Sequence, residues 1–361
     1  MPDIQCQQCK RPYPTQGLPY RCPACGGGLA FDGPITLDLD RVEADLPGIW
    51  RYRHTFSLFP GAQVVSLGEG NTPLVWEELD GLRLGLKMEA MNPTGSYKDR
   101  GTAVLVSQLA ARGARSAVED SSGNAGASFA AYAARARLGA RVFVPEAASG
   151  PKRAQIEAYG AELVRVPGPR SAAAQAVQAA AGQGAVYASH AYLPFGLPGI
   201  ATIAYELYAQ LGRAPGSIVA PVGHGGLLVG IQQGFTALVN SGKIPGEPYY
   251  LAVQAERCAP LWWAATHSGG GEPAEGQTIA EGVRVKTPAH LATLLELLDG
   301  RRGAVAAVAE DDILPAYREL AGRGIYVEPT SAIVWSAIQP LMGRIPEPIV
   351  LILTGSGLKY Q

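Results

Sequence analysis

From about residue 82 onward, short runs of apolar residues alternate with longer segments in which apolar residues recur at helical spacing. The length of the short runs and the glycine or proline beside them identify these runs as strands. Predicted strands lie at 83–88, 117–119, 141–145 and 162–166, separated by helices at 101–112, 125–138, 151–159 and 171–183. The same rhythm returns with strands of a second sheet at 217–222, 249–255, 304–308 and 349–354, and Gly269 to Gly271 mark a loop.

Strands that alternate with helices imply right-handed crossovers and mainly parallel sheets covered on both faces. A chain of 361 residues is too long for one comfortable core, so we predict an α/β protein with two α/β domains. The expected division is a small separate module at 1–33, a connecting arm and part of the large domain at 34–81, mainly the smaller domain at 82–200, and mainly the large domain at 201–361. Ligands of such sheets bind beyond the carboxyl ends of the strands.

Four of the five cysteines lie in the first 25 residues as two CxxC pairs, Cys6 with Cys9 and Cys22 with Cys25. Two such turns aim four thiolates at one centre and complete the tetrahedral shell that zinc prefers. We predict a small zinc ribbon, with a structural metal because its shell is closed. The alternatives are two disulfides or four free thiols. Disulfides are disfavoured because the segment from Met1 to Cys6 has no features of an export signal.

Charge and hydropathy narrow the classes of function. The formal net charge is −1, the isoelectric point is near 6.5, and charges of one sign do not form runs. We therefore expect neither nucleic acid nor an acidic membrane surface as a partner. No stretch approaches the roughly 18 apolar residues that a transmembrane helix needs, and a cytoplasmic protein is the expectation.

Four segments carry candidate chemistry at predicted strand ends. The first, 92–101 with the sequence NPTGSYKDRG, opens a helix that Ser96 could cap, although by spacing alone Lys98 could be an ordinary surface lysine. In the second, 121–126, backbone N–H groups could bind a carboxylate and Asn124 could contact a ring hydroxyl, or the loop could merely cap a helix. The glycines of the third, 221–227, could cradle a phosphate. The fourth, 353–359, is LTGSGLK.

Together these segments resemble the tryptophan-synthase-β-like, or type II, pyridoxal-phosphate enzymes, and the form NPTGSYKDRG resembles that of the threonine synthases. Residues 66–74 resemble the family's entry motif, and 328–332 resemble its E-P-x-S-A helix start. The resemblance covers about residues 64 to 360. It implies two doubly wound, three-layer α/β domains, here preceded by a zinc ribbon, and a homodimer.

The resemblance also implies roles for individual residues. Lys98 would hold pyridoxal 5'-phosphate as a Schiff base and move protons to and from the substrate carbons, while Asn124 would contact the phenolic oxygen of the cofactor. Thr354 would bond the pyridine nitrogen, which suits elimination and replacement chemistry, with Ser356 as the fallback if the register slips by two. The implied cofactor-phosphate loop is Val222, Gly223, His224, Gly225, Gly226 and Leu227, and the implied substrate-carboxylate site is Ser121, Ser122 and Gly123.

The sequence departs from the threonine synthases where the substrate binds. These enzymes act on O-phosphohomoserine and hold its phosphate partly with an arginine after a central strand, but the matching stretch 188–198 has neither arginine nor lysine. Ser189 and His190 remain as candidate ligands, without the stronger bond that a cation supplies. The loop 224–227 is closer in style to threonine and serine dehydratases, and Ser356 and Tyr360 stand where many threonine synthases carry histidine and aspartate.

The leading hypothesis is a threonine synthase-like carbon–oxygen lyase acting on a small amino acid, with γ-elimination of phosphate and addition of water at the β-carbon. The alternatives are a threonine or serine ammonia-lyase, a β-replacement enzyme such as a cysteate synthase, and a binding protein without turnover. Isolated residues are assigned to packing or to the surface: Cys258 to packing, and His54, His267 and His290 to surface or core positions.

Overall fold

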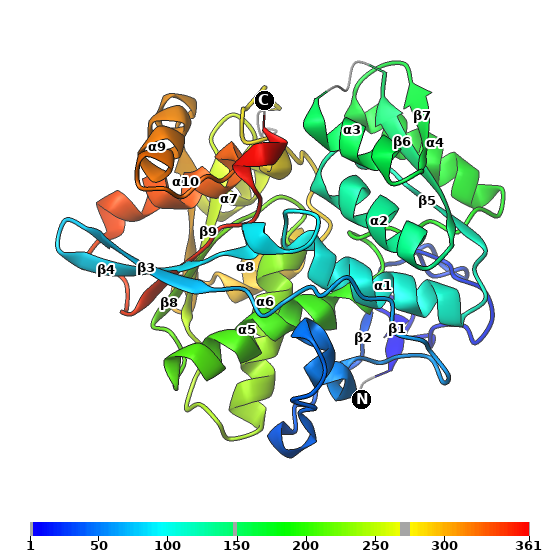
Figure 1. The fold of residues 1–361 in the computed structure, drawn as a ribbon, viewed down its shortest axis with the longest axis horizontal. Helices are drawn as coiled ribbons and strands as arrows, with labels where there is room; N and C mark the ends of the chain where they lie inside the picture. The colour runs from blue at the N-terminus through cyan, green and yellow to red at the C-terminus, as the bar shows by residue number, and fades with distance from the viewer. Residues whose placement is uncertain (1–2, 147–149, 268–274, 361) are drawn as a thin grey trace.

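The computed structural model describes residues 3–146, 150–267 and 275–360, so the predicted loop at Gly269 to Gly271 lies outside the described residues. The chain is an α/β protein with two parallel-rich sheets and a short N-terminal hairpin (Figure 1). In the described ranges, none of the helices combines the length and apolar character needed to cross a bilayer.

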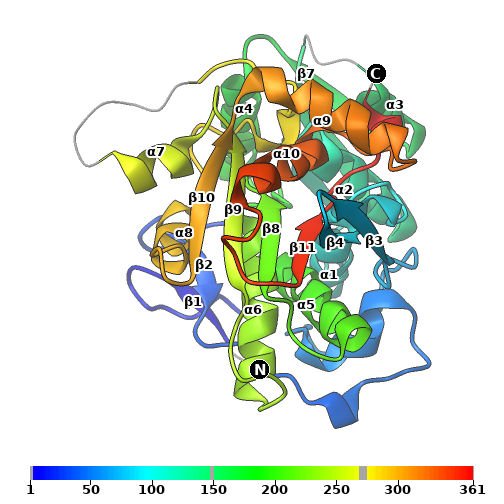
Figure 2. The same cartoon turned by 90° about the vertical axis from the view of Figure 1, so that its left-hand side faces the viewer.

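The larger sheet has six strands in the order β10-β9-β8-β11-β4-β3, parallel except for the edge pair β3–β4 (Figure 2). Residues of β8 alternate between its two faces: Ile218 packs with one core cluster and Val219 with another. The strands are β3 (Leu74–Leu79), β4 (Leu82–Lys87), β8 (Ser217–Pro221), β9 (Tyr249–Ala255), β10 (Gly303–Val308) and β11 (Ile349–Ile352). The helices that cover the two faces are α5 (Leu197–Leu211) and α6 (Gly226–Asn240) on one, and α9 (Glu310–Gly322) and α10 (Pro329–Ile338) on the other, with α7 (Pro260–Thr266) and α8 (Leu291–Leu297) near β10.

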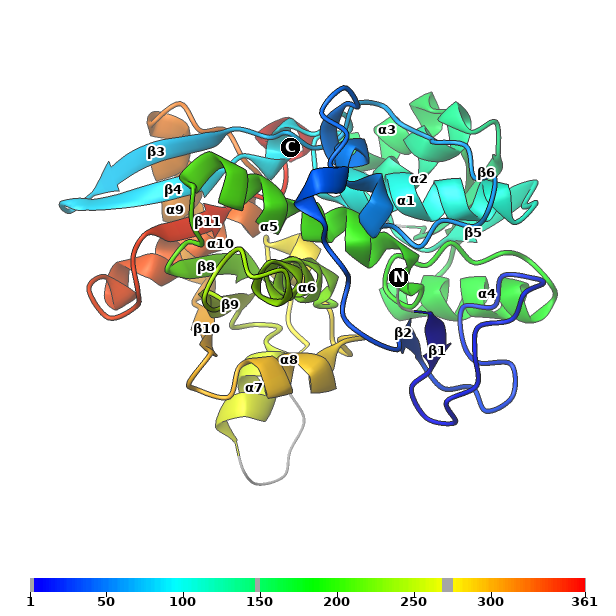
Figure 3. The same ribbon diagram turned by 90° about the horizontal axis from the view of Figure 1, so that it is seen from below.

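The smaller sheet is parallel, in the order β5-β6-β7, and Tyr187 extends it by a parallel bridge to Val118. Its strands are β5 (Ser116–Glu119), β6 (Gly139–Pro145) and β7 (Glu162–Val166), and its helices are α1 (Lys98–Ala111), α2 (Asn124–Arg135), α3 (Pro151–Ala158) and α4 (Arg170–Gly182). Helix α1 packs against α2 and also against α5, so it joins the two halves of the molecule (Figure 3).

The N-terminal hairpin pairs β1 (Ile4–Cys6) with β2 (Leu29–Phe31) in antiparallel fashion. The arm that follows is packed and not free: Ile49 and Trp50 are almost fully buried in the same core cluster as residues of α1. Single-turn or short 3₁₀ segments complete the description: η1 (Leu39–Arg41), η2 (Gly48–Thr55), η3 (Glu89–Met91), η4 (Pro194–Gly196), η5 (Glu281–Val283), η6 (Gln339–Leu341) and η7 (Gly357–Lys359).

The α/β fold class and the predicted strands and helices are confirmed, with shifts of a few residues at their ends. One grouping was wrong: the strand expected at 83–88 among those of the smaller domain is β4, which pairs with β11 of the larger sheet. Strand β3 was not predicted. It returns along β4 through a two-residue turn, in which Asp80 and Gly81 both have positive φ, as a tight hairpin turn requires. The domain limits themselves stay a prediction.

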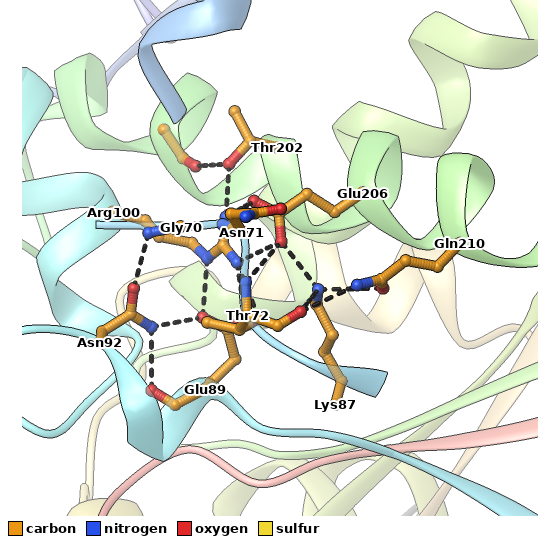
Figure 4. Close-up of polar contacts among 11 residues, drawn as sticks. Gly70, Asn71, Thr72, Lys87, Glu89, Asn92, Arg100, Thr202, Glu206 and Gln210 are labelled. Atoms are coloured by element: carbon orange, nitrogen blue, oxygen red, sulfur yellow. Dashed lines mark hydrogen bonds and ion pairs between the residues drawn. The ribbon is translucent and has the colours of Figure 1, made fainter. Parts of the chain in front are cut away.

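A buried network of charges joins α1, β4, η3 and α5 (Figure 4). The guanidinium of Arg100 donates to both carboxylates, Glu89 and Glu206, at 2.7 Å, and Lys87 Nζ donates to Glu206 at 2.7 Å. Although burial raises the pKa of Glu206, the charges of Arg100 and Lys87 bring it down to about 2. Thr72 closes the network by donating to Glu89 at 2.7 Å. Two cations therefore balance two carboxylates.

We predict that Arg100→Met lowers the free energy of unfolding by about 3–5 kcal/mol, because it leaves two buried carboxylates with one cation. The matched control is Arg53→Met, which breaks the exposed pair with Glu43 and should cost about 1 kcal/mol or less. Urea denaturation followed by circular dichroism measures both variants. Equal losses in the two variants would contradict the importance of the buried network.

Candidate active site

A cavity of about 1010 Å³ lies at the carboxyl ends of β5, β8 and β11 and the first turns of α1, α2 and α6. This edge is where open α/β sheets bind ligands. Val222 and Ser189 are not among the residues that line the cavity, and Ser189 Oγ instead accepts from the backbone of its own loop. The residues singled out from the sequence that do line it are Lys98, Ser121, Ser122, Gly123, Asn124, His190, Gly223, His224, Gly225, Gly226, Leu227 and Thr354.

Lys98 is the first residue of α1, and its Nζ lies 5.0 Å from the ring centroid of Tyr97. The turn before it is held by Asp99, whose buried carboxylate accepts from Thr94 Oγ1 at 2.6 Å and from Ser128 Oγ at 2.7 Å. Burial raises the pKa of Asp99 to about 6. These buried polar contacts hold the turn before α1 and so fix the position of the Lys98 backbone.

Thr354 comes just after β11 and lies beside this turn. Its carbonyl accepts from the backbone N–H of Tyr97 at 3.0 Å, and its Oγ1 lies 3.0 Å from Ser331 Oγ. Ser331 belongs to the E-P-T-S-A segment noted in the sequence. Ser356 does not line the cavity, and its Oγ caps η7. Of the two hydroxyls weighed for the pyridine nitrogen, Thr354 is the one that faces the cavity.

Asn124 is the first residue of α2 and lines the cavity. Its Nδ2 donates to Glu328 Oε1 at 2.8 Å, and Glu328 in turn pairs with Lys152 Nζ at 3.1 Å. The buried Asn124 Oδ1 has no hydrogen-bond partner in the described part of the chain. An amide carries two N–H groups, so one donor of Asn124 remains for a ligand.

The glycine loop after β8 forms an open cradle at the start of α6, which has no side-chain cap. Gly225 has a φ of +96°, and an added Cβ there would lie 2.6 Å from Leu294 Cδ1. At Gly223 an added Cβ would lie 2.8 Å from the carbonyl oxygen of Gly282. Side chains are therefore excluded and backbone N–H groups stay accessible to an anion, the arrangement that binds phosphate.

Three histidines gather beside this loop. His190 Nδ1 lies 2.5 Å from Glu119 Oε1, and the rings of His190 and His224 are 5.8 Å apart between centroids. His290 was expected to be isolated, but its backbone N–H donates to the backbone carbonyl of His224, and its imidazole lies near Gly226. Burial lowers the pKa of all three imidazoles, that of His290 to about 4, so they are uncharged at neutral pH.

The four N-terminal cysteines meet, as their spacing predicted. Their sulfur atoms all lie within 4.8 Å of one another, and none of the four is in a disulfide. The backbone N–H of Cys9 lowers the pKa of the Cys6 thiol to about 6. Although the backbone N–H of Gly27 acts to lower it, the pKa of Cys25 is raised to about 12 by contact with the other three sulfur atoms. The thiolate, which Cys6 therefore favours, is the form that binds metals. A tetrahedral zinc with Zn–S bonds of about 2.3 Å needs this kind of close set, so the donors fit the metal.

The N-terminal segment that carries the four cysteines, residues 3–33, is called the cysteine module, and it also supports one wall of the cavity. The ring of Tyr20 packs edge-on against Tyr187, with centroids 5.0 Å apart, and the guanidinium of Arg21 lies 4.9 Å from the ring of Tyr192. Both Tyr187 and Tyr192 line the cavity, and Tyr187 donates to Asp120 at 2.7 Å. No local pattern in the sequence predicts this contact, since nothing links residues 20 and 187 along the chain.

The family model for pyridoxal-phosphate-dependent enzymes matches residues 65–355. The chain belongs to this family. It is a threonine synthase-like lyase within it, since it is 33% identical to the threonine synthase of Methanocaldococcus jannaschii over 98% of this chain and 92% of that protein. Identity to the threonine synthase of Methanosarcina acetivorans is 31%, over 99% of this chain and 92% of that protein. Identity to the threonine synthase of Mycobacterium leprae is 34%, over 82% of this chain and 83% of that protein.

Solved structures of this family share the fold. The crystal structure of a T.th. threonine deaminase is 28% identical, with a TM-score of 0.65 over 79% of this chain and 92% of that one. Maize serine racemase, at 21% identity and a TM-score of 0.69 over 79% and 88%, shows the fold alone. The α/β architecture expected from the resemblance is therefore confirmed.

Glu119 gives a prediction for the pH dependence of stability. Burial raises its pKa in the folded protein from 4.5 to about 7, so its contribution to stability is complete below about pH 4.5 and is lost as the pH rises through 7. Glutamine cannot titrate. The free energy of unfolding of the wild type minus that of Glu119→Gln should therefore fall between about pH 4.5 and 7 and then level off.

Urea denaturation at several pH values measures this difference, with Glu157→Gln on the exposed side of α3 as the matched control. Parallel curves for the wild type and Glu119→Gln would contradict the raised pKa of Glu119.

Proposed function

We propose that this chain converts O-phosphohomoserine and water into threonine and inorganic phosphate. The observation that carries the proposal is the meeting of Lys98, Asn124, the glycine loop and Thr354 around one cavity. Supporting it is the likeness to curated threonine synthases over nearly the whole chain. We further propose that the protein acts as a cytoplasmic homodimer that binds neither nucleic acid nor membranes.

The residues around the cavity fit pyridoxal phosphate. When bound, this cofactor withdraws electrons from an amino acid joined to it, so that protons leave the neighbouring carbon atoms. Lys98 Nζ would hold the cofactor, the free N–H of Asn124 would face its phenolic oxygen, and Thr354 Oγ1 its ring nitrogen. The N–H groups of residues 223–227, at the start of α6, would bind the cofactor phosphate.

Lys98 would also move the protons of the reaction. Its amine would take a proton from the α-carbon and release it before taking one from the β-carbon. The C–O bond at the γ-carbon would then break, and its electron pair would leave with phosphate. Protons would return to the γ- and α-carbons, the hydroxyl of water would add at the β-carbon, and the remaining proton of the water would go to the released phosphate, so that one water is consumed for each phosphate released. Ser121, Ser122 and Gly123, with the uncapped start of α2, would hold the substrate carboxylate.

A second candidate is an ammonia-lyase acting on threonine or serine. Two observations favour it: the 28% identity to a threonine deaminase structure and the absence of arginine and lysine from 188–198. This reaction would use the same cofactor residues, and would release ammonia instead of phosphate.

We also propose that the four cysteines bind one structural zinc per chain. Their sulfur atoms fit a tetrahedral shell, and the packing of Tyr20 on Tyr187 gives the module a role in supporting the cavity wall.

We predict that Lys98→Ala abolishes the visible absorption band of the lysine-bound cofactor and lowers phosphate release from O-phosphohomoserine by roughly 10³-fold or more, the scale of losing an acid–base group. Lys243→Ala, at an exposed position after α6, is the matched control and should behave as the wild type. Absorption spectra and assays of phosphate and ammonia measure both. Ammonia from threonine or serine, with O-phosphohomoserine inert, would favour the ammonia-lyase instead.

We predict that Cys9→Ser loses the bound zinc while Arg11→Ala, an exposed non-ligand of the same module, keeps it. Because Tyr20 and Arg21 support Tyr187 and Tyr192, loss of the metal should raise the KM for substrate and leave the visible cofactor band in place. Atomic absorption measures the metal, and steady-state kinetics the KM. A Cys9→Ser protein with full zinc content would show that the cysteines are not the metal site.

A further inference from the structure

Arg170 is the first residue of α4, just beyond the carboxyl end of β7. It lines the same cavity as Lys98, together with Ser171 and the cavity-facing tyrosines of the Tyr187–Tyr192 wall. The loops after β5 and β7 leave the same edge of one parallel sheet, so Arg170 lies on the side of the cavity that the smaller sheet forms. Arg170 carries no signal in the sequence, because it follows a strand with no recognisable motif.

Arg170 differs from most other cations of the cavity in having no partner among the described residues. Lys152 pairs with Glu328, Lys359 Nζ donates to the carbonyl of Thr94, and Arg284 donates to Gln277. Lys286 pairs with Glu275. Of the cavity-lining cations in the described ranges, Lys98 and Arg170 alone have no hydrogen bond or ion pair. A half-buried guanidinium has five donors to satisfy, and an anion satisfies them best.

The charges of Arg170 and Lys98 act on the same two histidines, so both cations lie near one part of the cavity. The positive charges of both lower the pKa of His190 and of His224, beyond the lowering that burial causes. The carboxyl groups nearby compete weakly for Arg170, since burial raises the pKa of Glu119 to about 7 and also raises that of Asp120. Asp120 is moreover engaged by the hydroxyl of Tyr187.

We propose that Arg170 binds the phosphate of the substrate, with the hydroxyl of Ser171 and the uncapped first turn of α4 as additional donors. This inference rests on the proposed function and names the residue that takes the place of the arginine missing from 188–198. The subsite lies between Tyr192 and the start of α4, within reach of a short substrate held near Lys98. It explains how this chain selects a phosphoester although its Ser189 segment carries no cation.

The test compares wild type, Arg170→Gln and Arg170→Lys as cofactor-loaded enzymes. Loss of a charge-assisted, forked contact to a phosphate dianion should raise the KM for O-phosphohomoserine by roughly 10- to 100-fold in Arg170→Gln, with a smaller change in kcat. Arg170→Lys keeps the positive charge but cannot form two parallel hydrogen bonds to the phosphate, so its KM should lie between those of the wild type and Arg170→Gln. The matched control is Arg165→Gln, which removes one exposed positive charge from β7 outside the cavity.

Inorganic phosphate, used as a competitive inhibitor, supplies a second readout. Its inhibition constant should rise in Arg170→Gln in parallel with the KM and should stay unchanged in Arg165→Gln. If the wild type releases phosphate but Arg170→Gln keeps its KM and its inhibition constant, the Arg170 subsite is wrong and the proposed function stands.

If the wild type is inert toward O-phosphohomoserine, the proposed function fails and binding decides the subsite separately. Calorimetric titration of the cofactor-loaded wild type and Arg170→Gln with inorganic phosphate then compares their affinities. Weaker binding to Arg170→Gln supports an anion subsite at Arg170, and equal binding overturns it.

Discussion

The buried charges around Arg100 are the constraint on which the rest of the structure depends. Two cations and two carboxylates stay together because separating any one of them would leave an uncompensated charge in the core. Arg100 belongs to α1, whereas its partners come from η3 and α5. Residues two apart on a helix point about 200° away from each other, so anchoring Arg100 inward turns Lys98 toward the cavity. The network thus holds the first turn of α1, where Lys98 lies, and the bond from the Tyr97 N–H to the Thr354 carbonyl places that turn beside β11.

Burial determines which groups around the cavity are charged and which are neutral. Its histidines are kept neutral by desolvation, while two cations without a partner among the described residues, Lys98 and Arg170, stand at separate points of its wall. The glycine loop adds backbone donors at a third point. A ligand with several anionic groups suits this distribution, and a neutral apolar ligand does not.

The N-terminal cysteine module is more than an appendage. Its aromatic and cationic residues pack against the outer side of Tyr187 and Tyr192, which line the cavity. Tyr187 is also joined to β5 through its bridge with Val118. The cysteine module therefore supports, through one layer of side chains, the part of the cavity wall that Tyr187 and Tyr192 form.

The sequence by itself determined what local patterns encode. Alternating apolar runs identified the strands of both sheets except β3, and the paired CxxC turns indicated a metal module, because spacing and turn chemistry act over a few residues. The role of Lys98 came from the resemblance of the NPTGSYKDRG segment to a family and not from its spacing. Only the tertiary structure decided the pairing of β4 with β11, the meeting of His290 with His224, the support of Tyr187 by Tyr20 and the placement of Arg170 in the cavity. These features join residues far apart in the chain, and such contacts depend on how whole elements pack rather than on any local preference.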